Sequence, residues 1–193
     1  AGDFCFNKIV PNYFSRTDDS GVFSNGSCCG NDTASERSMV RKYIVDSVKY
    51  WADEYHIDGF RFDLVGLIDI ATINTLMTEV RKDHPNVIFY GEGWSMGTHV
   101  TKPGVELCTQ ANSIKVPGFA FFSDTIRDLM RGSVFYDDEP GYVHGAHVSK
   151  DALESCFMGI PQWCADPCQS INYVSCHDNN TLIDRLTLAA MDT

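Results

Sequence analysis

Acidic residues follow apolar, strand-like segments at two places in the first half of the chain. The segment DGFRFDLVG contains Arg61 and Asp63, and alternation along a strand points both side chains to the same face. Glu92 comes 92 − 63 = 29 residues later, in the segment FYGEGW, between Gly91 and Gly93. Two carboxyl groups on adjacent strand ends can act as the nucleophile and the general acid/base of a retaining glycosidase, which needs them roughly 5 to 5.5 Å apart.

The neighbours of these carboxyl groups suit the same chemistry. An adjacent arginine favours the ionised form of Asp63, which is the form that a nucleophile needs. Trp94, beside Glu92, is typical of a sugar-stacking platform or of an apolar wall that raises the pKa of an acid. Each residue also has a structural explanation, because Arg61 and Asp63 can form an ordinary ion pair and Trp94 can be a core aromatic. The pair of strand-end carboxyl groups is therefore more informative than any one residue.

A third polar group follows a later apolar segment. In SCHDNNTLIDRL, His177 and Asp178 come directly after the segment INYVSC, so both can reach the same edge of a sheet. Asn179, Asn180 and Thr181 then suit the start of a helix. A structural role in a turn explains Asp178 equally well at this point.

The elements that must position these residues are indicated by periodicity. Thr33 and Glu36 have the spacing of a capping box, and the apolar stripe that follows predicts a helix over 34–56. The next elements expected are, in order, a strand over 57–66, a helix capped by Asp69 and ended at His84-Pro85, and a strand over 86–94. A third strand is expected from Gly118, a short helix from Thr125, a helix over 150–158, a fourth strand from Ile171 and a final helix after it.

This alternation predicts parallel strands joined by helical crossovers. Four strands are about half of an eight-stranded barrel, which typically needs about 250 residues. We therefore expect α/β class, with residues 1–193 forming part of one (β/α)8 TIM-barrel domain. Residues 1–32 are predicted to be a loop region and residues 133–169 an irregular insertion.

Composition limits the classes of partner. The chain has 15 basic and 26 acidic residues, a formal charge of −11, which argues against nucleic acid as a partner. With 44% hydrophobic and 21% charged residues a packed core is expected, and no apolar run is long enough to span a membrane. The eight cysteines favour a reducing compartment, so we expect a cytoplasmic protein, although a secreted parent stays open. Oligomeric state is left open.

The three motifs also carry a resemblance. DGFRFDLVG, FYGEGW and YVSCHDN, in this order at predicted strand ends, resemble motifs of the α-amylase family of glycoside hydrolases, in wording closest to its type I pullulanase branch. That branch cuts α-1,6 links in pullulan, glycogen and amylopectin. The resemblance implies that Asp63 is the nucleophile, Glu92 the general acid/base and Asp178 a third catalytic carboxylate that grips sugar hydroxyls. Arg61 and His177 would support them, with Trp94 as a further substrate-binding residue.

The resemblance also implies which strands and helices of the barrel this chain contains. The earlier Asn-His motif of the family has no match here, so we expect a catalytic-domain fragment with middle to late strand-helix units, lacking the early strands and the last one. Ile183 stands where many relatives have tryptophan, which puts one substrate contact in doubt.

Other functions remain open at this stage. Within the family these are an α-1,4-acting amylase or a glucanotransferase, and for the chain alone an inactive α-glucan-binding fragment. No cofactor is expected to be required, and no metal ligand is assigned. Calcium at Asp137, Asp138 and Glu139 lacks the spacing of a calcium loop. A zinc protein is a third class, with the candidate ligands His144, His147, Cys156, Cys164 and Cys168, none of which form a C-x-x-C pair.

Overall fold

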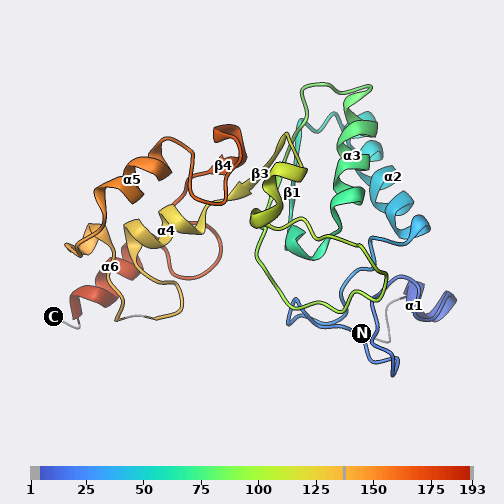
Figure 1. Ribbon diagram of the computed structural model, residues 1–193, viewed down its shortest axis with the longest axis horizontal. Coiled ribbons are helices and arrows are strands. Elements are labelled where there is room, and N and C mark those ends of the chain that lie inside the picture. Colours follow the sequence, from blue (N-terminus) through green and yellow to red (C-terminus); the bar gives the residue numbers. More distant parts are fainter. Residues whose placement is uncertain (1–4, 137, 192–193) are drawn as a thin grey trace. The chain divides into compact units, whose positions relative to one another are not determined.

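Residues 5–136 and 138–191 are described in the computed structural model shown in Figure 1. The contacts within the chain divide it into two compact units, Ala1–Phe119 and Ala120–Thr193. Asp137 and the terminal residues 1–4 and 192–193 lie outside the described residues. The prediction that the whole chain is part of one barrel domain stays a prediction.

The first unit contains two long helices that pack against each other (Figure 1). Its elements are α1 Cys5–Ile9, α2 Ser38–Tyr55, β1 Gly59–Phe62, the 3-10 turn η1 Val65–Leu67, α3 Ile70–Arg81, β2 Ile88–Gly91 and the 3-10 turn η2 Gln110–Lys115. The apolar stripe of α3 is buried, with Ile73, Leu76 and Val80 fully shielded from solvent. Phe89 of β2 is 2% exposed, which completes a core between strands and helices.

The second unit continues the alternation of strands and helices. Its elements are α4 Asp124–Arg131, the 3-10 turn η3 Tyr142–His144, α5 Lys150–Phe157, the 3-10 turn η4 Pro167–Gln169, β4 Ser170–Ile171 and α6 Leu182–Met191. Strand β3, Phe119–Phe122, spans the boundary between the units. Buried arginines replace part of an apolar core here, and Arg185 donates to the backbone carbonyls of Tyr136 (3.1 Å) and Glu139 (2.7 Å).

The four strands form one sheet in the order β1-β2-β3-β4. Strands β1 and β2 are parallel, with Phe60 opposite Phe89 and Phe62 opposite Gly91, and β3 and β4 are also parallel, with Phe122 opposite Ile171. Parallel strands that neighbour each other in chain order, with helices between them, are the arrangement of an α/β barrel. The predicted fold class, a partial barrel unit, is confirmed.

Helix α2 begins later than predicted, at Ser38 instead of residue 34, because the expected cap residues have other partners. Thr33 forms an antiparallel bridge with Ser15. Glu36 forms a buried ion pair with Arg16, at 2.8 Å from Nη2 to Oε2. The capping-box prediction is therefore wrong, since a long-range ion pair outweighs the local hydrogen bond.

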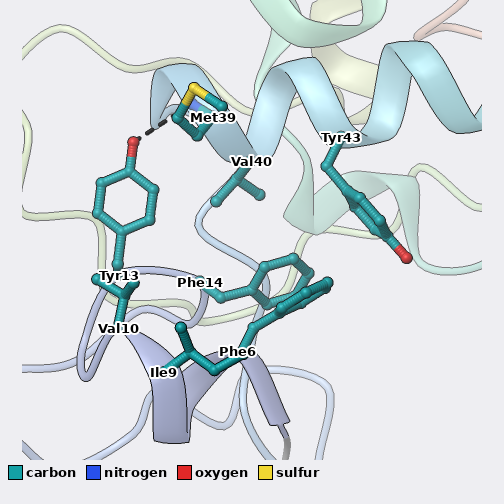
Figure 2. Close-up of a pocket in the computed structure, with 8 residues that line it drawn as sticks. All are labelled: Phe6, Ile9, Val10, Tyr13, Phe14, Met39, Val40 and Tyr43. Carbon is teal, nitrogen blue, oxygen red and sulfur yellow. Dashed lines mark hydrogen bonds between the residues drawn. The ribbon is translucent and has the colours of Figure 1, made fainter.

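The prediction of loop throughout residues 1–32 differs from the structure at α1. Phe6 of this short helix contacts Phe14 and Tyr43, with ring centroids 5.0 and 5.3 Å apart. Figure 2 shows these rings beside a pocket of about 250 Å³ between α1 and the start of α2. The Met39 N–H donates to the Tyr13 hydroxyl at the edge of this pocket, at 3.3 Å. Aromatic packing against α2 thus stabilises a helix too short to have a clear sequence pattern.

A later element also differs in extent from the prediction. Strand β4 ends at Ile171, although the sequence predicted a strand through residue 176. Beyond it, the Asn172 side chain donates to the Cys156 carbonyl at 2.8 Å, and the Val174 carbonyl accepts from Arg131 at 3.3 Å. These groups therefore bind α4 and α5 and do not continue the strand. The helix predicted over 150–158, within the predicted irregular insertion 133–169, is observed as α5, and the Ser149 side chain caps its start.

Candidate active site

Arg61 joins the two carboxyl groups that the sequence singled out. Its Nη1 lies 2.5 Å from Oδ1 of Asp63, and its Nη2 lies 2.8 Å from Oε1 of Glu92. The separation of the two carboxyl groups is thus limited to the width of one guanidinium and two hydrogen bonds. This compact arrangement is compatible with the spacing of a retaining glycosidase.

The register of β1 and β2 explains why these residues meet. Phe62 is opposite Gly91, so Asp63 and Glu92 are the next residues at the carboxyl ends of neighbouring parallel strands. The Glu92 N–H donates to the Phe62 carbonyl at 3.2 Å and holds this register one step further. A Cβ at Gly91 would lie 2.4 Å from the Phe62 oxygen, so the strands approach this closely only with glycine at that position.

Leu64 binds the second oxygen of Glu92, a role that no sequence pattern predicts. Its backbone is left-handed, with φ 44° and ψ 45°, which is uncommon for a residue with a Cβ. This conformation turns the Leu64 N–H toward Oε2 of Glu92, at 3.0 Å. Both oxygens of Glu92 therefore accept hydrogen bonds. Strain next to a pair of carboxyl groups is a feature of functional sites.

The two carboxyl groups have different surroundings. The side chain of Asp63 is 74% exposed, whereas that of Glu92 is 9% exposed. An exposed carboxylate can reach an incoming ligand, and a buried one is held in a fixed orientation by Arg61 and Leu64. Environments that differ in this way allow two carboxyl groups to take two chemical roles.

Trp94 is half-buried at the start of the segment that follows β2. Its carbonyl lies so close to Gly66 that a Cβ there would be 2.0 Å from the oxygen. The Gly66 N–H donates to the Glu92 carbonyl at 3.0 Å, so the turn after β1 is bonded to the end of β2. The predicted stacking role of Trp94 stays a prediction.

Asp32 anchors the segment after Trp94 to the polar loop near the N-terminus. It accepts hydrogen bonds from the Thr98 hydroxyl at 2.6 Å, the Gly26 N–H at 2.8 Å and the Ser24 hydroxyl at 2.7 Å. Burial raises the pKa of Asp32, but these hydrogen bonds outweigh burial and leave the pKa below its usual range. Sequence reasoning missed this contact, because residues 66 positions apart carry no local signal.

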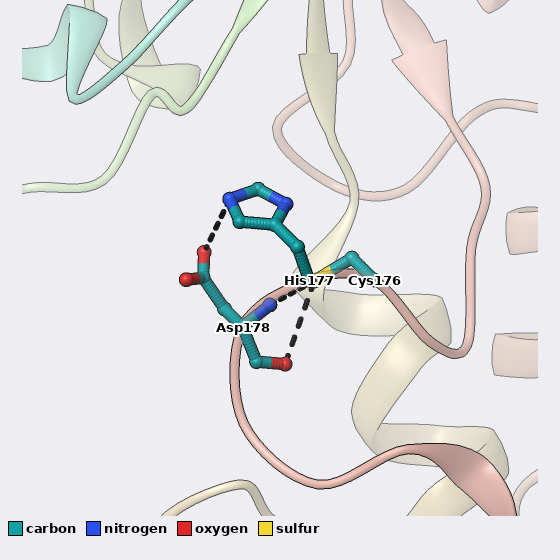
Figure 3. Close-up of side chains that lie close together, drawn as sticks. All are labelled: Cys176, His177 and Asp178. Carbon is teal, nitrogen blue, oxygen red and sulfur yellow. Dashed lines mark hydrogen bonds and ion pairs between the residues drawn. The ribbon is translucent and has the colours of Figure 1, made fainter.

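His177 and Asp178 lie together in the second unit, in the loop between β4 and α6. Figure 3 shows the imidazole facing the carboxylate, with Nε2 of His177 3.5 Å from Oδ2 of Asp178. Both side chains are well exposed, at 69% and 52%. The structure thus brings Arg61, Asp63 and Glu92 together in the first unit and His177 with Asp178 in the second.

The zinc ligands suggested by the sequence do not assemble. Within the described part of the chain, ligand atoms of three or more metal-binding side chains lie within 4.8 Å of one another only at Cys176, His177 and Asp178. The Nδ1 of His144 instead accepts from the Gly141 N–H at 3.3 Å. The five-residue zinc hypothesis is wrong. The calcium hypothesis includes Asp137, which lies outside the described residues, and is untested.

Among the described residues, no helix has the length and apolar character needed to cross a bilayer. All eight cysteines fall within those residues and are free thiols. Burial raises the pKa of the Cys108 and Cys156 thiols above the usual range, which is typical of inert structural cysteines.

Comparison with known proteins places the chain within larger relatives. It is 42% identical over 190 residues to pullulanase from Bacillus subtilis (strain 168), covering 95% of this chain and 26% of that protein. It is 31% identical over 231 residues to pullulanase from Klebsiella pneumoniae, covering 95% of this chain and 21% of that protein. The chain therefore spans about a quarter of the length of these curated relatives. No protein-family model matches it.

Comparison with solved structures gives the same result as comparison of sequences. The crystal structure of pullulanase from Paenibacillus barengoltzii, in complex with maltohexaose and α-cyclodextrin, matches all of this chain and 30% of its own, with a TM-score of 0.93 and 39% identity. Pullulanase from Anoxybacillus sp. LM18-11, complexed with maltotetraose, matches all of this chain and 28% of its own, with a TM-score of 0.93 and 42% identity. Sequence and fold thus agree along nearly the whole chain, which matches a segment of the type I pullulanases, a branch of the glycoside hydrolases.

Proposed function

We propose that this chain carries the nucleophile and the general acid/base of an enzyme that hydrolyses α-1,6-glucosidic links in pullulan, glycogen or amylopectin. The observation that carries the proposal is the contact of one guanidinium with the carboxyl groups of Asp63 and Glu92, at neighbouring strand ends. Its relatives are pullulanases, and several were solved with maltooligosaccharides.

In the proposed mechanism, Asp63 attacks the anomeric carbon while Glu92 protonates the glycosidic oxygen. The exposed carboxylate of Asp63 suits the attack. Once Glu92 is protonated, it keeps one strong acceptor oxygen, so its contact with Arg61 or with the Leu64 N–H must weaken. Water, activated by Glu92 as base, then releases the sugar with retained configuration.

Other residues have supporting roles in the proposal. Asp178 would hold sugar hydroxyls in the transition state, with Arg61, Trp94 and His177 as substrate-binding residues. No cofactor is needed, because two carboxyl groups suffice for retaining hydrolysis. The proposed compartment is the cytoplasm, supported by the eight free cysteines.

The decisive test is the release of sugar from pullulan. Because the chain spans 26% of the Bacillus subtilis pullulanase, it is best assayed both alone and grafted in place of the matching segment of that protein. Maltotriose as the product indicates α-1,6 cleavage, and panose-like products indicate the α-1,4-acting alternative. In the active form, Asp63→Ala and Glu92→Gln should each lower kcat by roughly a thousandfold or more.

A matched control separates chemistry from folding. Asp46→Asn changes a carboxylate on the exposed face of α2, where it pairs with Lys42 at the surface. It should leave kcat within about twofold of the unmodified chain. Nearly unchanged activity of Asp63→Ala would exclude Asp63 as the nucleophile.

The short span of the chain favours a second candidate function for the isolated chain, which is α-glucan binding without turnover. Calorimetric titration with maltotetraose distinguishes the two. If the isolated chain binds maltotetraose but releases no sugar, and activity appears only in the graft, then catalysis requires the rest of the grafted protein.

A further inference from the structure

Cys176, His177 and Asp178 bring three different metal-ligating groups to one point (Figure 3). A thiol sulfur, an imidazole nitrogen and a carboxylate oxygen lie within 4.8 Å of one another. The nitrogen and oxygen are already 3.5 Å apart, which is about the separation of two ligands of a tetrahedral zinc ion, given bonds of roughly 2.0 to 2.3 Å.

We propose that Cys176, His177 and Asp178 form a site for one Zn²⁺ ion. On binding, Cys176 gives up its thiol proton to solvent, and the ion takes the thiolate sulfur, an imidazole nitrogen and a carboxylate oxygen as ligands. The exposure of His177 and Asp178 leaves the fourth position to water, as in zinc sites with three protein ligands.

The chain geometry favours this site. The Asp178 N–H donates to the Cys176 sulfur at 3.4 Å, which folds the loop back so that the side chains on either side of His177 lie close together. Because the three ligands are consecutive in sequence, no long loop has to be closed when the ion binds. The Cys176 thiol also donates to the Asp178 carbonyl at 3.6 Å, and zinc binding would replace this contact.

Charge and ligand softness select the ion. A thiolate and a carboxylate give two negative charges, and the cation of Arg131 interacts electrostatically with Cys176. The site therefore attracts a divalent cation. Sulfur and imidazole ligands favour Zn²⁺ over Ca²⁺ and Mg²⁺, which prefer oxygen ligands.

The site has a consequence that rests on the proposed function. If Asp178 grips sugar hydroxyls, then a zinc ion on its carboxylate competes with the sugar. Zinc would therefore act as an inhibitor of α-glucan binding, and Cys176 would make this chain sensitive to it.

The test begins with a chain in which four other exposed cysteines, Cys5, Cys28, Cys29 and Cys168, are replaced by serine, so that they cannot bind zinc. Calorimetric titration with ZnCl2, under reducing conditions, should give one ion per chain. Titration with Co²⁺ should produce the near-ultraviolet charge-transfer band of a thiolate-cobalt bond. CaCl2 and MgCl2 should not compete.

Adding Cys176→Ser to this chain should weaken Zn²⁺ binding at least roughly tenfold and abolish the cobalt band. His177→Gln should weaken binding by a similar factor and keep the band. Circular dichroism checks that each variant is folded, which is expected because the replaced side chains are exposed. Absence of Zn²⁺ binding, equal affinity in Cys176→Ser or equal competition by Ca²⁺ would overturn the proposal.

A second titration, with maltotetraose, separates the metal site from the proposed function. Zn²⁺ should lower the affinity for maltotetraose in the chain with Cys176 and not in Cys176→Ser. If the chain binds no maltotetraose under any condition, the proposed function fails in this form, while the zinc titration alone still decides the metal site.

Discussion

At the scale of single residues, Arg61 determines the geometry of the candidate site. A planar guanidinium can bind two carboxyl groups at once through different nitrogens, which a lysine ammonium cannot do with the same fixed orientation. The side chain of Glu92 is 9% exposed, so its charge needs the partners that Arg61 and the Leu64 N–H provide. Arg61 thus permits a buried carboxyl group beside an exposed one.

We predict that the left-handed backbone of Leu64 limits which residues are tolerated there. Leu64→Gly should change the free energy of unfolding by less than about 1 kcal/mol, because glycine adopts φ 44° without strain. Leu64→Val should be less stable than Leu64→Gly by about 1 to 2 kcal/mol, since a β-branched residue is strongly disfavoured in this region. Urea unfolding monitored by tryptophan fluorescence measures both. Equal stability of the two variants would show that the conformation is not maintained in solution.

The sequence was sufficient to predict part of this site. Strand alternation and parallel register place Arg61, Asp63 and Glu92 at one edge, and the structure confirms that they meet. The role of Leu64 could not be predicted, because leucine carries no signal for a left-handed backbone. The anchor from Asp32 to Thr98 could not be predicted either, since it depends on tertiary packing of distant loops.

At the scale of elements, one predicted local cap forms and another does not. Asp69 caps α3 as expected, and its side chain accepts from the Thr72 N–H at 2.9 Å. Glu36 fails as a capping residue because Arg16 binds it. Apolar composition predicts strands at β1, β2 and β3, whereas β4 contains only Ile171 of the predicted strand, because Asn172 and Val174 bond to α5 and α4.

We predict that the Asp69 cap makes stability depend on acidic pH. Burial raises the pKa of Asp69, but hydrogen bonds from Thr72 and Ser35 and the charge of Arg41 outweigh it, so the folded-state pKa is below the usual value. The stabilisation is therefore complete above the unfolded pKa of about 4 and is lost as pH falls through the lower folded pKa.

Asp69→Asn should accordingly lower the free energy of unfolding by about 2 kcal/mol at pH 7. The difference from the unmodified chain should shrink as pH falls below about 4. Urea unfolding at a series of pH values measures it, with Asp46→Asn as the surface control expected to have little effect throughout. A difference that stays constant down to acid pH would contradict the role of the ionised cap.

At the scale of the whole molecule, the contacts within the chain divide it into two compact units. Each unit has its own buried charged network. In the first, Arg16 is 1% exposed and binds Glu36 and the Leu67 carbonyl, the latter at 2.6 Å. In the second, Arg127 donates to the Tyr173 hydroxyl at 3.0 Å. A network within each unit lets that unit unfold with its own midpoint.

We predict that thermal unfolding of the chain departs from a two-state transition, with a van't Hoff enthalpy smaller than the calorimetric enthalpy. Glu36→Gln leaves the buried Arg16 without its carboxylate, at a cost of about 3 to 5 kcal/mol, and should lower only the midpoint of the first unit. Tyr173→Phe removes one hydrogen-bond partner of Arg127 and should lower only the midpoint of the second, by about 1 to 2 kcal/mol of stability.

Scanning calorimetry of the three chains tests this, because each substitution marks one unit while leaving the other as an internal reference. If both variants shift a single transition whose two enthalpies agree, the units are cooperative and the chain behaves as one domain. If each variant shifts its own transition, then the proposed nucleophile and acid/base depend on the stability of the first unit alone, since Asp63 and Glu92 both lie within it.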